Sequence, residues 1–251
     1  MSELSEASTK RALTPATFIE RWSGREGGQE RSNYSMFLRE LSEIISAPIP
    51  DPASASHEFN DYVFERVVER RRPDGTIERG RIDLYKRNCF ILEAKQSRQK
   101  GAKKAVIEGQ ADLFADSKAQ SAHSDAIDHL MINARRQAEG YAQALPKDHA
   151  YPPFLLTCDV GRTIEVYADF SGHGRHYTQF PDARNFRIEL PKLIDPEVRE
   201  HLRRIWVEPL SLDPAVQTAK VTREIAGTLA EVSKALEARG FAQTEVAVFL
   251  M

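Results

Sequence analysis

The sequence predicts an α/β fold in which one mixed central sheet is flanked by helices, with a helical appendage at the C-terminus. One amphipathic helical pattern precedes three strand-like segments, and a second precedes two more, which is typical of a sandwich built on one sheet. After about Pro209 only helical patterns follow. We therefore expect a flexible tail at 1–14, an α/β domain at 15–209 and a helical part at 210–251.

The first helix is predicted over residues 30–48, and a proline-containing run at 48–52 ends it. A second helix is predicted over 125–145, where Pro146 stops it. The polar, Lys- and Gln-rich stretch 96–124 supports no assignment. The apolar side chains of the first helix recur at helical spacing: Tyr34, Phe37, Leu38, Leu41, Ile44 and Ile45.

Three strands rich in β-branched and aromatic residues are predicted at 61–69, 76–85 and 89–95. A Pro-Asp-Gly turn separates the first two, and a tight turn at an asparagine separates the second from the third. This order predicts an antiparallel meander. Two further strands, at 153–159 and 163–170, are joined by a glycine turn and complete the expected sheet.

The helical part begins with Asp213 as N-cap and Pro214 in the first turn, and Gly240 marks the end of its first helix. A second helical run reaches Met251, so we expect the chain to continue in a longer protein. The first of these helices carries an apolar seam: Val221, Ile225, Leu229, Val232 and Leu236.

Composition indicates an ordinary soluble protein, because 41% of the 251 residues are hydrophobic and 29% are charged. No run approaches the roughly 18 to 20 apolar residues of a membrane span, and the polar N-terminus has no secretory signal. We expect a cytoplasmic, prokaryotic protein. Cys89 and Cys158 lie in apolar runs without a CxxC pair, so we expect buried, reduced thiols.

Acidic residues interrupt two of the apolar strands. Side chains alternate along a strand, so Glu93 and Lys95 share one side of the sheet, and Asp83 of the preceding strand can converge on them. Two carboxylates make a hard oxygen site suited to Mg²⁺ or Mn²⁺. Lys95 could orient a water molecule and offset charge on a phosphate. Taken alone, a Glu-x-Lys triplet is more typical of a strand-end salt bridge than of a catalytic site.

Basic residues outnumber acidic ones between Tyr62 and Lys104, which suits a polyanionic partner, although a solvated charged hairpin would show the same excess. Net charge over the whole chain is only −2. We expect the basic residues to contact phosphates of double-stranded DNA without reading its sequence. The candidates for these contacts are Arg70, Arg71, Arg72, Arg98 and Lys100.

The constellation resembles the PD-(D/E)xK nuclease superfamily, with Asp83 as the first acid and Glu93-Ala94-Lys95 as the ExK triplet. Gln137 and Tyr141, spaced i and i+4 on the second helix, are similar to the QxxxY motif of its RecB-like branch. This implies Asp83 and Glu93 as Mg²⁺ ligands, Lys95 as a catalytic group, and Gln137 and Tyr141 as supporting or phosphate-contacting residues. Ile82, rather than proline, precedes the aspartate.

Either of two residues could supply an additional acidic ligand: Glu30 or Glu58. Histidine-based chemistry is the less favoured alternative, because the histidines show no partner carboxylate pattern and read as surface or loop residues. The aromatic side chains at strand spacing, and both tryptophans, read as packing residues rather than as base-stacking ones. These residues are His123, His129, His173, His176, Tyr167, Phe170, Tyr177, Phe180, Trp22 and Trp206.

Several long segments in order, spanning most of 15–251, resemble the N-terminal part of MmeI-like type IIG/IIL restriction–modification enzymes, which act in phage defence. The resemblance implies a site-specific endonuclease domain at 15–209 and the start of a helical connector at 210–251. In the parent protein it implies an adenine DNA methyltransferase that uses S-adenosylmethionine, and a target-recognition domain. No motif of that methyltransferase occurs in this chain. Cleavage could involve transient self-association.

A second reading is a catalytically silent DNA-binding or scaffolding module that belongs to a DNA methyltransferase. It shares the fold and the basic residues but needs no metal. Intact Asp83, Glu93 and Lys95 favour the nuclease.

Overall fold

The computed structural model describes residues 13–23, 30–54, 60–71, 75–97 and 115–250. The chain divides into two compact units, Met1–Pro209 and Leu210–Met251, each taken separately below.

The first unit is built on a seven-stranded sheet in the order β1-β2-β3-β4-β5-β6, with β7 also paired to β5. All neighbouring strands run antiparallel except β3 and β4, which are parallel, so the sheet is mixed. The strands are β1 (Tyr62–Arg71), β2 (Ile77–Lys86), β3 (Phe90–Lys95), β4 (Phe154–Asp159), β5 (Thr163–Ala168), β6 (Thr178–Gln179) and β7 (Arg187–Glu189).

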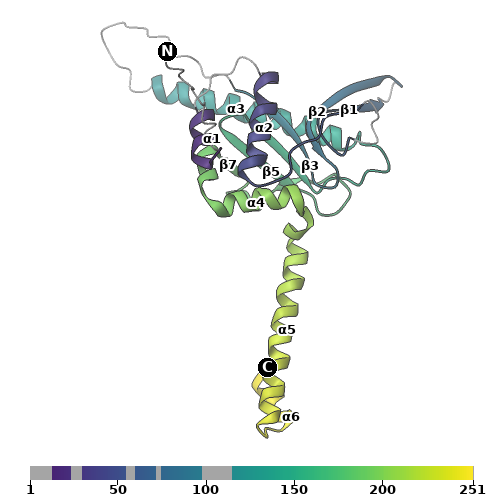
Figure 1. Ribbon diagram of the computed structural model, residues 1–251, viewed down its shortest axis with the longest axis vertical. Coiled ribbons are helices and arrows are strands. Elements are labelled where there is room, and N and C mark those ends of the chain that lie inside the picture. Colours follow the sequence, from purple (N-terminus) through teal and green to yellow (C-terminus); the bar gives the residue numbers. More distant parts are fainter. Residues whose placement is uncertain (1–12, 24–29, 55–59, 72–74, 98–114, 251) are drawn as a thin grey trace, which may run out of the picture. The chain divides into compact units, whose positions relative to one another are not determined.

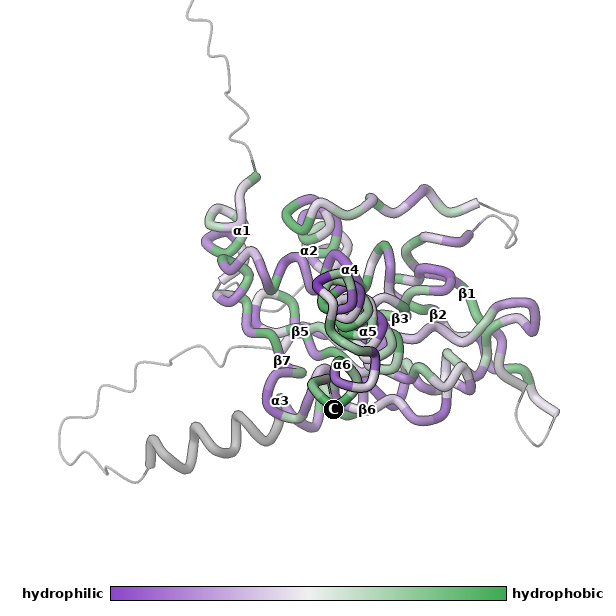
Figure 2. The backbone as a smooth tube through the Cα atoms, turned by 90° about the horizontal axis from the view of Figure 1, so that it is seen from below, coloured by the Kyte–Doolittle hydropathy of each residue, from purple (hydrophilic) through white to green (hydrophobic). Residues whose placement is uncertain are grey.

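Helices cover both faces of this sheet. Figure 2 shows α1 and α2 on one side of the strands and α3 on the other. Two parallel strands require a crossover connection, and α3 lies in the segment that joins β3 to β4. The described helices of this unit are α1 (Pro15–Trp22), α2 (Glu30–Ile44), α3 (Ala115–Ala142) and α4 (Pro196–Val207), with the short 3-10 helix η2 (Leu190–Ile194) (Figure 1). The 3-10 helix η3 (Pro209–Leu212) begins at the last residue of the unit.

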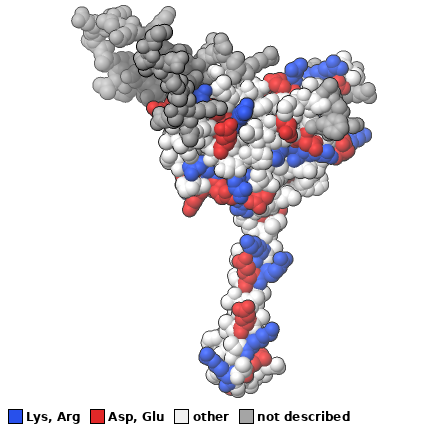
Figure 3. Space-filling model, viewed as in Figure 1, with Lys and Arg blue, Asp and Glu red and all other residues white. Residues whose placement is uncertain are grey.

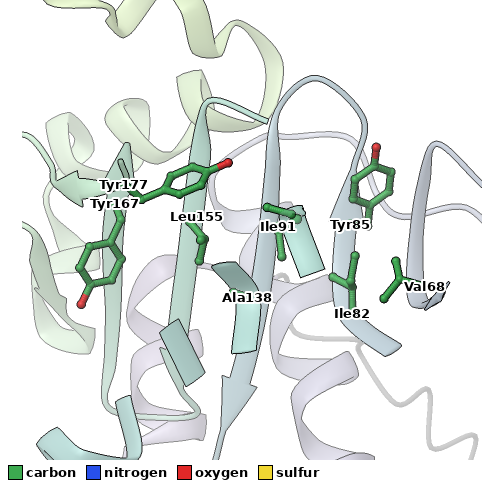
Figure 4. Packing of buried hydrophobic residues seen from close by; sticks show 9 residues of the cluster. Val68, Ile82, Tyr85, Ile91, Ala138, Leu155, Tyr167 and Tyr177 are labelled. Atoms are coloured by element: carbon green, nitrogen blue, oxygen red, sulfur yellow. The ribbon is translucent and has the colours of Figure 1, made fainter. Parts of the chain in front are cut away.

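The core on the α3 side joins five strands to one helix. Figure 4 shows Ala138 of α3 between Leu155 and Ile91, with Ile82 and Tyr85 on the far side of Ile91. Small residues at the helix contact let the α3 backbone approach the sheet closely, and every one of these side chains is buried. The second predicted helix is therefore present, and it begins earlier than residue 125.

The core on the α2 side is rich in aromatic rings. The Tyr62 hydroxyl donates to the Pro48 carbonyl at 3.0 Å and accepts the Trp206 indole N–H at 3.0 Å, which ties α4 to β1. The Phe90 and Trp206 ring centroids lie 4.3 Å apart. Both tryptophans are fully buried, as are most of the aromatic residues expected to pack, and both cysteines are buried and free.

Two helices of this unit have clear start signals that periodicity alone did not reveal. Thr14 caps α1 by accepting the Thr17 N–H, and Asp195 caps α4 by accepting the Glu197 N–H; a proline follows each cap. Helix α1 has only eight residues, which is too short for a periodic pattern to stand out.

The second unit consists of α5 (Pro214–Ala238) and α6 (Gln243–Leu250). Asp213 caps α5 by accepting the Ala215 N–H at 2.8 Å, and Gly240 after its end has a φ of +95°, a left-handed conformation that favours glycine. The predicted seam of α5 is present but largely exposed: Ile225, for example, is 55% exposed. Among the described helices, none combines the length and apolar character that crossing a membrane demands.

Candidate active site

The strands β2 and β3 separate at the acidic positions. Their pairing includes Leu84 with Leu92 and ends there, so the next opposed positions are Asp83 and Glu93. Beyond that point the Ala94 N–H donates a hydrogen bond to the Asp83 carboxylate at 2.8 Å instead of to a backbone carbonyl of β2. The predicted hairpin therefore brings Asp83 onto the Glu-x-Lys triplet.

Glu93 is a buried carboxyl group that is poorly supplied with hydrogen-bond donors. It is 0% exposed, and none of the residues that the structure describes makes a hydrogen bond of normal geometry to either of its oxygens. The Asp83 backbone N–H approaches the carboxyl group closely enough to oppose the rise in its pKa, but it does not form such a bond. Burial, followed by the negative charge of Asp83, raises the pKa of Glu93 to about 9. The Lys95 ammonium, 3.8 Å from Oε2, opposes this rise in pKa but does not cancel it.

Other buried acids in the same unit are well supplied with donors. Asp159 accepts from the Ser97 N–H at 2.9 Å and from the Ser97 hydroxyl at 2.6 Å. Glu165 accepts from two hydroxyls and a guanidinium. Asp169 accepts from three backbone N–H groups and one hydroxyl, and these bonds hold the pKa of Asp169 at about 2. Buried polar groups are normally paired in this way, so Glu93 is the exception among the buried acids that the structure describes.

Lys95 is held at the end of β3 by its neighbours on β4. Its carbonyl accepts the Val160 N–H at 2.8 Å, and Asp159 lies beside it in the parallel register. The bonds from Ser97 to Asp159 fix the chain just after the lysine. The Lys95 side chain remains 20% exposed, so its ammonium can reach solvent while its backbone stays fixed.

The residues present fit a divalent cation. The two orphaned oxygens of Glu93, with the Asp83 carboxylate next to them, are hard donors that a positive charge would satisfy. Within the part of the chain that the structure describes, no group of three or more His, Cys, Asp or Glu side chains has metal-binding geometry. Two carboxylates still suit Mg²⁺, which usually keeps several water ligands.

Two further residues at this site escaped sequence reasoning. The Tyr34 hydroxyl of α2 donates a hydrogen bond to Glu65 of β1, and Glu65 adds to the repulsion that raises the pKa of Glu93. Burial and the neighbouring Glu65 raise the pKa of Tyr34, so Tyr34 remains a donor. The sequence could have indicated Glu65, because it is an acid inside the β-branched run of β1. Asp83 was singled out by the same kind of position in β2.

Gln137 and Tyr141 lie together on α3, where the Gln137 amide donates to the Tyr141 hydroxyl at 3.0 Å. Tyr141 packs on Gly80, three residues before Asp83 on β2; a Cβ at Gly80 would lie 2.4 Å from the tyrosine ring. The two side chains line a cavity of about 270 Å³ together with Arg79. Their supporting role in the site stays a prediction.

The remaining candidates cannot be placed. The side chains of Glu30, Arg70 and Arg71, and residues Glu58, Arg72, Arg98 and Lys100, lie outside what the structure describes. Two described arginines of the β1–β2 hairpin are ion-paired: Arg79 with Glu69 at 2.9 Å and Arg81 with Glu65 at 3.7 Å. On the face seen in Figure 3, basic and acidic residues are interspersed rather than separated into one basic patch.

Comparison with known proteins identifies the family. The model of a family described as "MmeI, N-terminal domain" matches residues 10–239, which is most of the chain. No curated protein and no solved structure gives a significant match. The chain therefore belongs to the family of MmeI N-terminal domains.

Proposed function

We propose that this chain is a Mg²⁺-dependent DNA endonuclease domain with a PD-(D/E)xK core, and that it is part of a restriction–modification protein. The observation that carries the proposal is the buried Glu93 carboxyl, which receives no hydrogen bond of normal geometry from the described residues and lies beside Asp83 and Lys95. An uncompensated buried acid costs stability, so its presence where two strands separate is explained best by a positively charged ligand.

In this proposal Asp83 and Glu93 hold the cation, and Mn²⁺ can replace Mg²⁺. The bound cation supplies Lewis acidity and lowers the pKa of a coordinated water. Lys95, fixed at its backbone and partly exposed at its side chain, orients the attacking water and stabilises the negative charge that develops on the phosphate. Hydrolysis then replaces one P–O ester bond with a bond to the water oxygen.

Gln137 and Tyr141 are proposed to support this chemistry from α3, either by contacting a DNA phosphate or by bracing β2 at Gly80. The two residues already form a bonded pair beside a polar cavity. This role is secondary, because the Gln137 side chain is exposed and neither residue has a bond to Asp83, Glu93 or Lys95 among the described contacts.

The family relation supports a division of labour within the parent protein. The adenine methyltransferase with its S-adenosylmethionine, and the target-recognition domain, would lie in other parts of that protein, and residues 210–251 would begin the connector to them. DNA is then bound here mainly through phosphates. We expect weak, strongly salt-dependent binding without sequence preference. A protein of this kind would act in the prokaryotic cytoplasm and could self-associate transiently during cleavage.

The proposal is tested by incubating the 251-residue chain with supercoiled plasmid and Mg²⁺. We expect nicking that EDTA abolishes and Mn²⁺ restores. Lys95→Ala should remove nicking while circular dichroism shows an intact fold, because the bonds that hold residue 95 at the end of β3 are made by its backbone. Binding titrations on unrelated duplexes at two salt concentrations complete the test.

Two outcomes contradict the proposal in different ways. Nicking that survives in Lys95→Ala would show that the activity comes from another site or a contaminant. Salt-dependent DNA binding without nicking, and without saturable Mn²⁺ binding, would identify the chain as the silent DNA-binding module instead.

A further inference from the structure

Three acidic residues occupy successive cross-strand positions at the site. The β1–β2 ladder pairs Phe64 with Leu84 and Arg66 with Ile82, and it skips the intervening pair of Glu65 and Asp83. Asp83 in turn faces Glu93, where the β2–β3 pairing has ended. The backbone ladder is thus interrupted on both sides of Asp83, at the same level of three neighbouring strands.

The conformation of Glu65 accounts for the first interruption. Its φ is +54°, in the left-handed region that glutamate rarely adopts and that interrupts a regular strand. Tyr34 of α2 donates a hydrogen bond from its hydroxyl to one oxygen of the Glu65 carboxylate. Arg81 lies 3.7 Å from the other oxygen, but its side chain is largely exposed. Glu65 is therefore held mainly by one hydrogen bond from a buried tyrosine.

An acidic cluster alone does not establish a ligand site, but Glu93 supplies an independent sign. Its two carboxylate oxygens are buried without donors, next to Asp83 and within the electrostatic reach of Glu65. Because no three acids in the described chain have direct coordination geometry, Glu65 is too far away to join the two presumed ligands as a third. A carboxylate at such a distance can still bind the water molecules that Mg²⁺ retains.

We propose that Glu65, positioned by Tyr34 and by its left-handed backbone, is a third acid of the cation site that acts on the cation's water shell rather than on the cation itself. This inference depends on the proposed nuclease function, because it assumes the cation held by Asp83 and Glu93. It adds a role at the site for two residues, Glu65 on β1 and Tyr34 on α2.

The test is calorimetric titration of the 251-residue chain with Mn²⁺ in the absence of DNA. Glu65→Gln should weaken Mn²⁺ binding about 10-fold, which is the lower end of what outer ligands typically contribute. Tyr34→Phe should weaken it about 2- to 3-fold, because the carboxylate stays but loses its donor. The matched control is Glu69→Gln, which removes a charge from the same strand at a glutamate that is paired with the exposed Arg79. It should leave Mn²⁺ affinity unchanged.

A second readout separates this role from simple structural support. Glu65→Gln removes the repulsion between Glu65 and Asp83, so its melting temperature in EDTA should be equal to or higher than that of the wild type while its Mn²⁺ affinity falls. A merely structural glutamate would lose both together. Equal Mn²⁺ affinities of Glu65→Gln and Glu69→Gln would overturn the inference. Failure of the proposed function looks different: the wild type would then show no saturable binding, or Asp83→Asn would leave binding intact.

Discussion

Glu93 and Glu165 are two buried glutamates of the same sheet with opposite surroundings. Glu165 on β5 accepts hydrogen bonds from Thr157 at 3.1 Å, Tyr167 at 2.7 Å and Arg187 at 2.8 Å. Glu93 on β3 is equally buried and accepts none from the described residues. Its nearest cation, Lys95, lies 3.8 Å away. One carboxylate is compensated by the fold and the other is not.

The difference shows how structure separates two acids that look alike in sequence. Each sits among β-branched and aromatic residues in a short strand. At Glu165, donors from β4, β5 and β7 converge, so the charge stabilises the packing of the sheet edge. At Glu93, a second acid converges instead. The first arrangement is structural, and the second leaves room for a ligand.

The largest expected effect is on catalysis. Under the proposed function, Glu93→Gln and Asp83→Asn should each lower Mg²⁺-dependent nicking by roughly 10²–10³-fold or more, because each removes a carboxylate from the cation. Glu165→Gln should keep its rate per folded molecule within about 3-fold of the wild type, since it would act only through stability. Initial nicking rates, normalised to the folded fraction, measure both. Similar losses in all three variants would erase the distinction between the two glutamates.

The free energy of unfolding should change more in Glu165→Gln than in Glu93→Gln, which is the reverse of the order expected for nicking. Glu165→Gln should lower the free energy of unfolding by about 2 kcal/mol at pH 7, because it leaves Arg187 and two hydroxyls with a poorer partner. Arg187 is partly exposed, which limits the loss. Glu93→Gln should change the same quantity by less than about 1 kcal/mol in EDTA, since Glu93 is already protonated there. Urea unfolding followed by fluorescence of Trp22 and Trp206 provides the measurement. A larger loss from Glu93→Gln would mean that Glu93 has donors in solution.

The pH dependence of stability should also differ between the two sites. The pKa of Glu93 is about 9 in the folded protein and near 4.5 in the unfolded chain, so between these values only the folded state holds the proton. Its contribution is complete below about pH 4.5 and is lost as pH rises through about 9. From pH 5 to pH 8 in EDTA, the wild type should lose on the order of 2 kcal/mol more stability than Glu93→Gln. Parallel curves for these two proteins would show that water or a donor reaches the carboxylate.

The smallest expected effect concerns the neighbouring helix. Tyr141→Phe removes only the hydroxyl that accepts from the Gln137 amide, an exposed bond, so the free energy of unfolding should change by about 0.5 kcal/mol. If the pair contacts a DNA phosphate, nicking at moderate salt should still fall a few-fold. The matched control is Tyr151→Phe, whose tyrosine packs against Gly174 at the β5 side of the sheet. Identical nicking rates for Tyr141→Phe and Tyr151→Phe would show that Gln137 and Tyr141 do not contribute to cleavage.

The sequence by itself determined the hairpin and its chemistry. Alternating residues, a turn at Asn88 and the spacing from Asp83 to Lys95 predicted β2 and β3 to within about a residue, because pairing across a tight turn is a local property. The caps of α5 were predicted for the same reason: Asp213 bonds to a backbone group two residues away. The family resemblance was likewise readable from ordered segments, and the family match supports it.

Only the tertiary structure decided which acids lack partners. The donors of Glu165 come from three strands, and the contact between Tyr34 and Glu65 joins a helix to a strand 31 residues away. The left-handed backbone of Glu65 has no signature in a run of β-branched residues. Burial and the convergence of charges depend on residues distant in the chain, so the raised pKa of Glu93 follows from packing that no local pattern encodes.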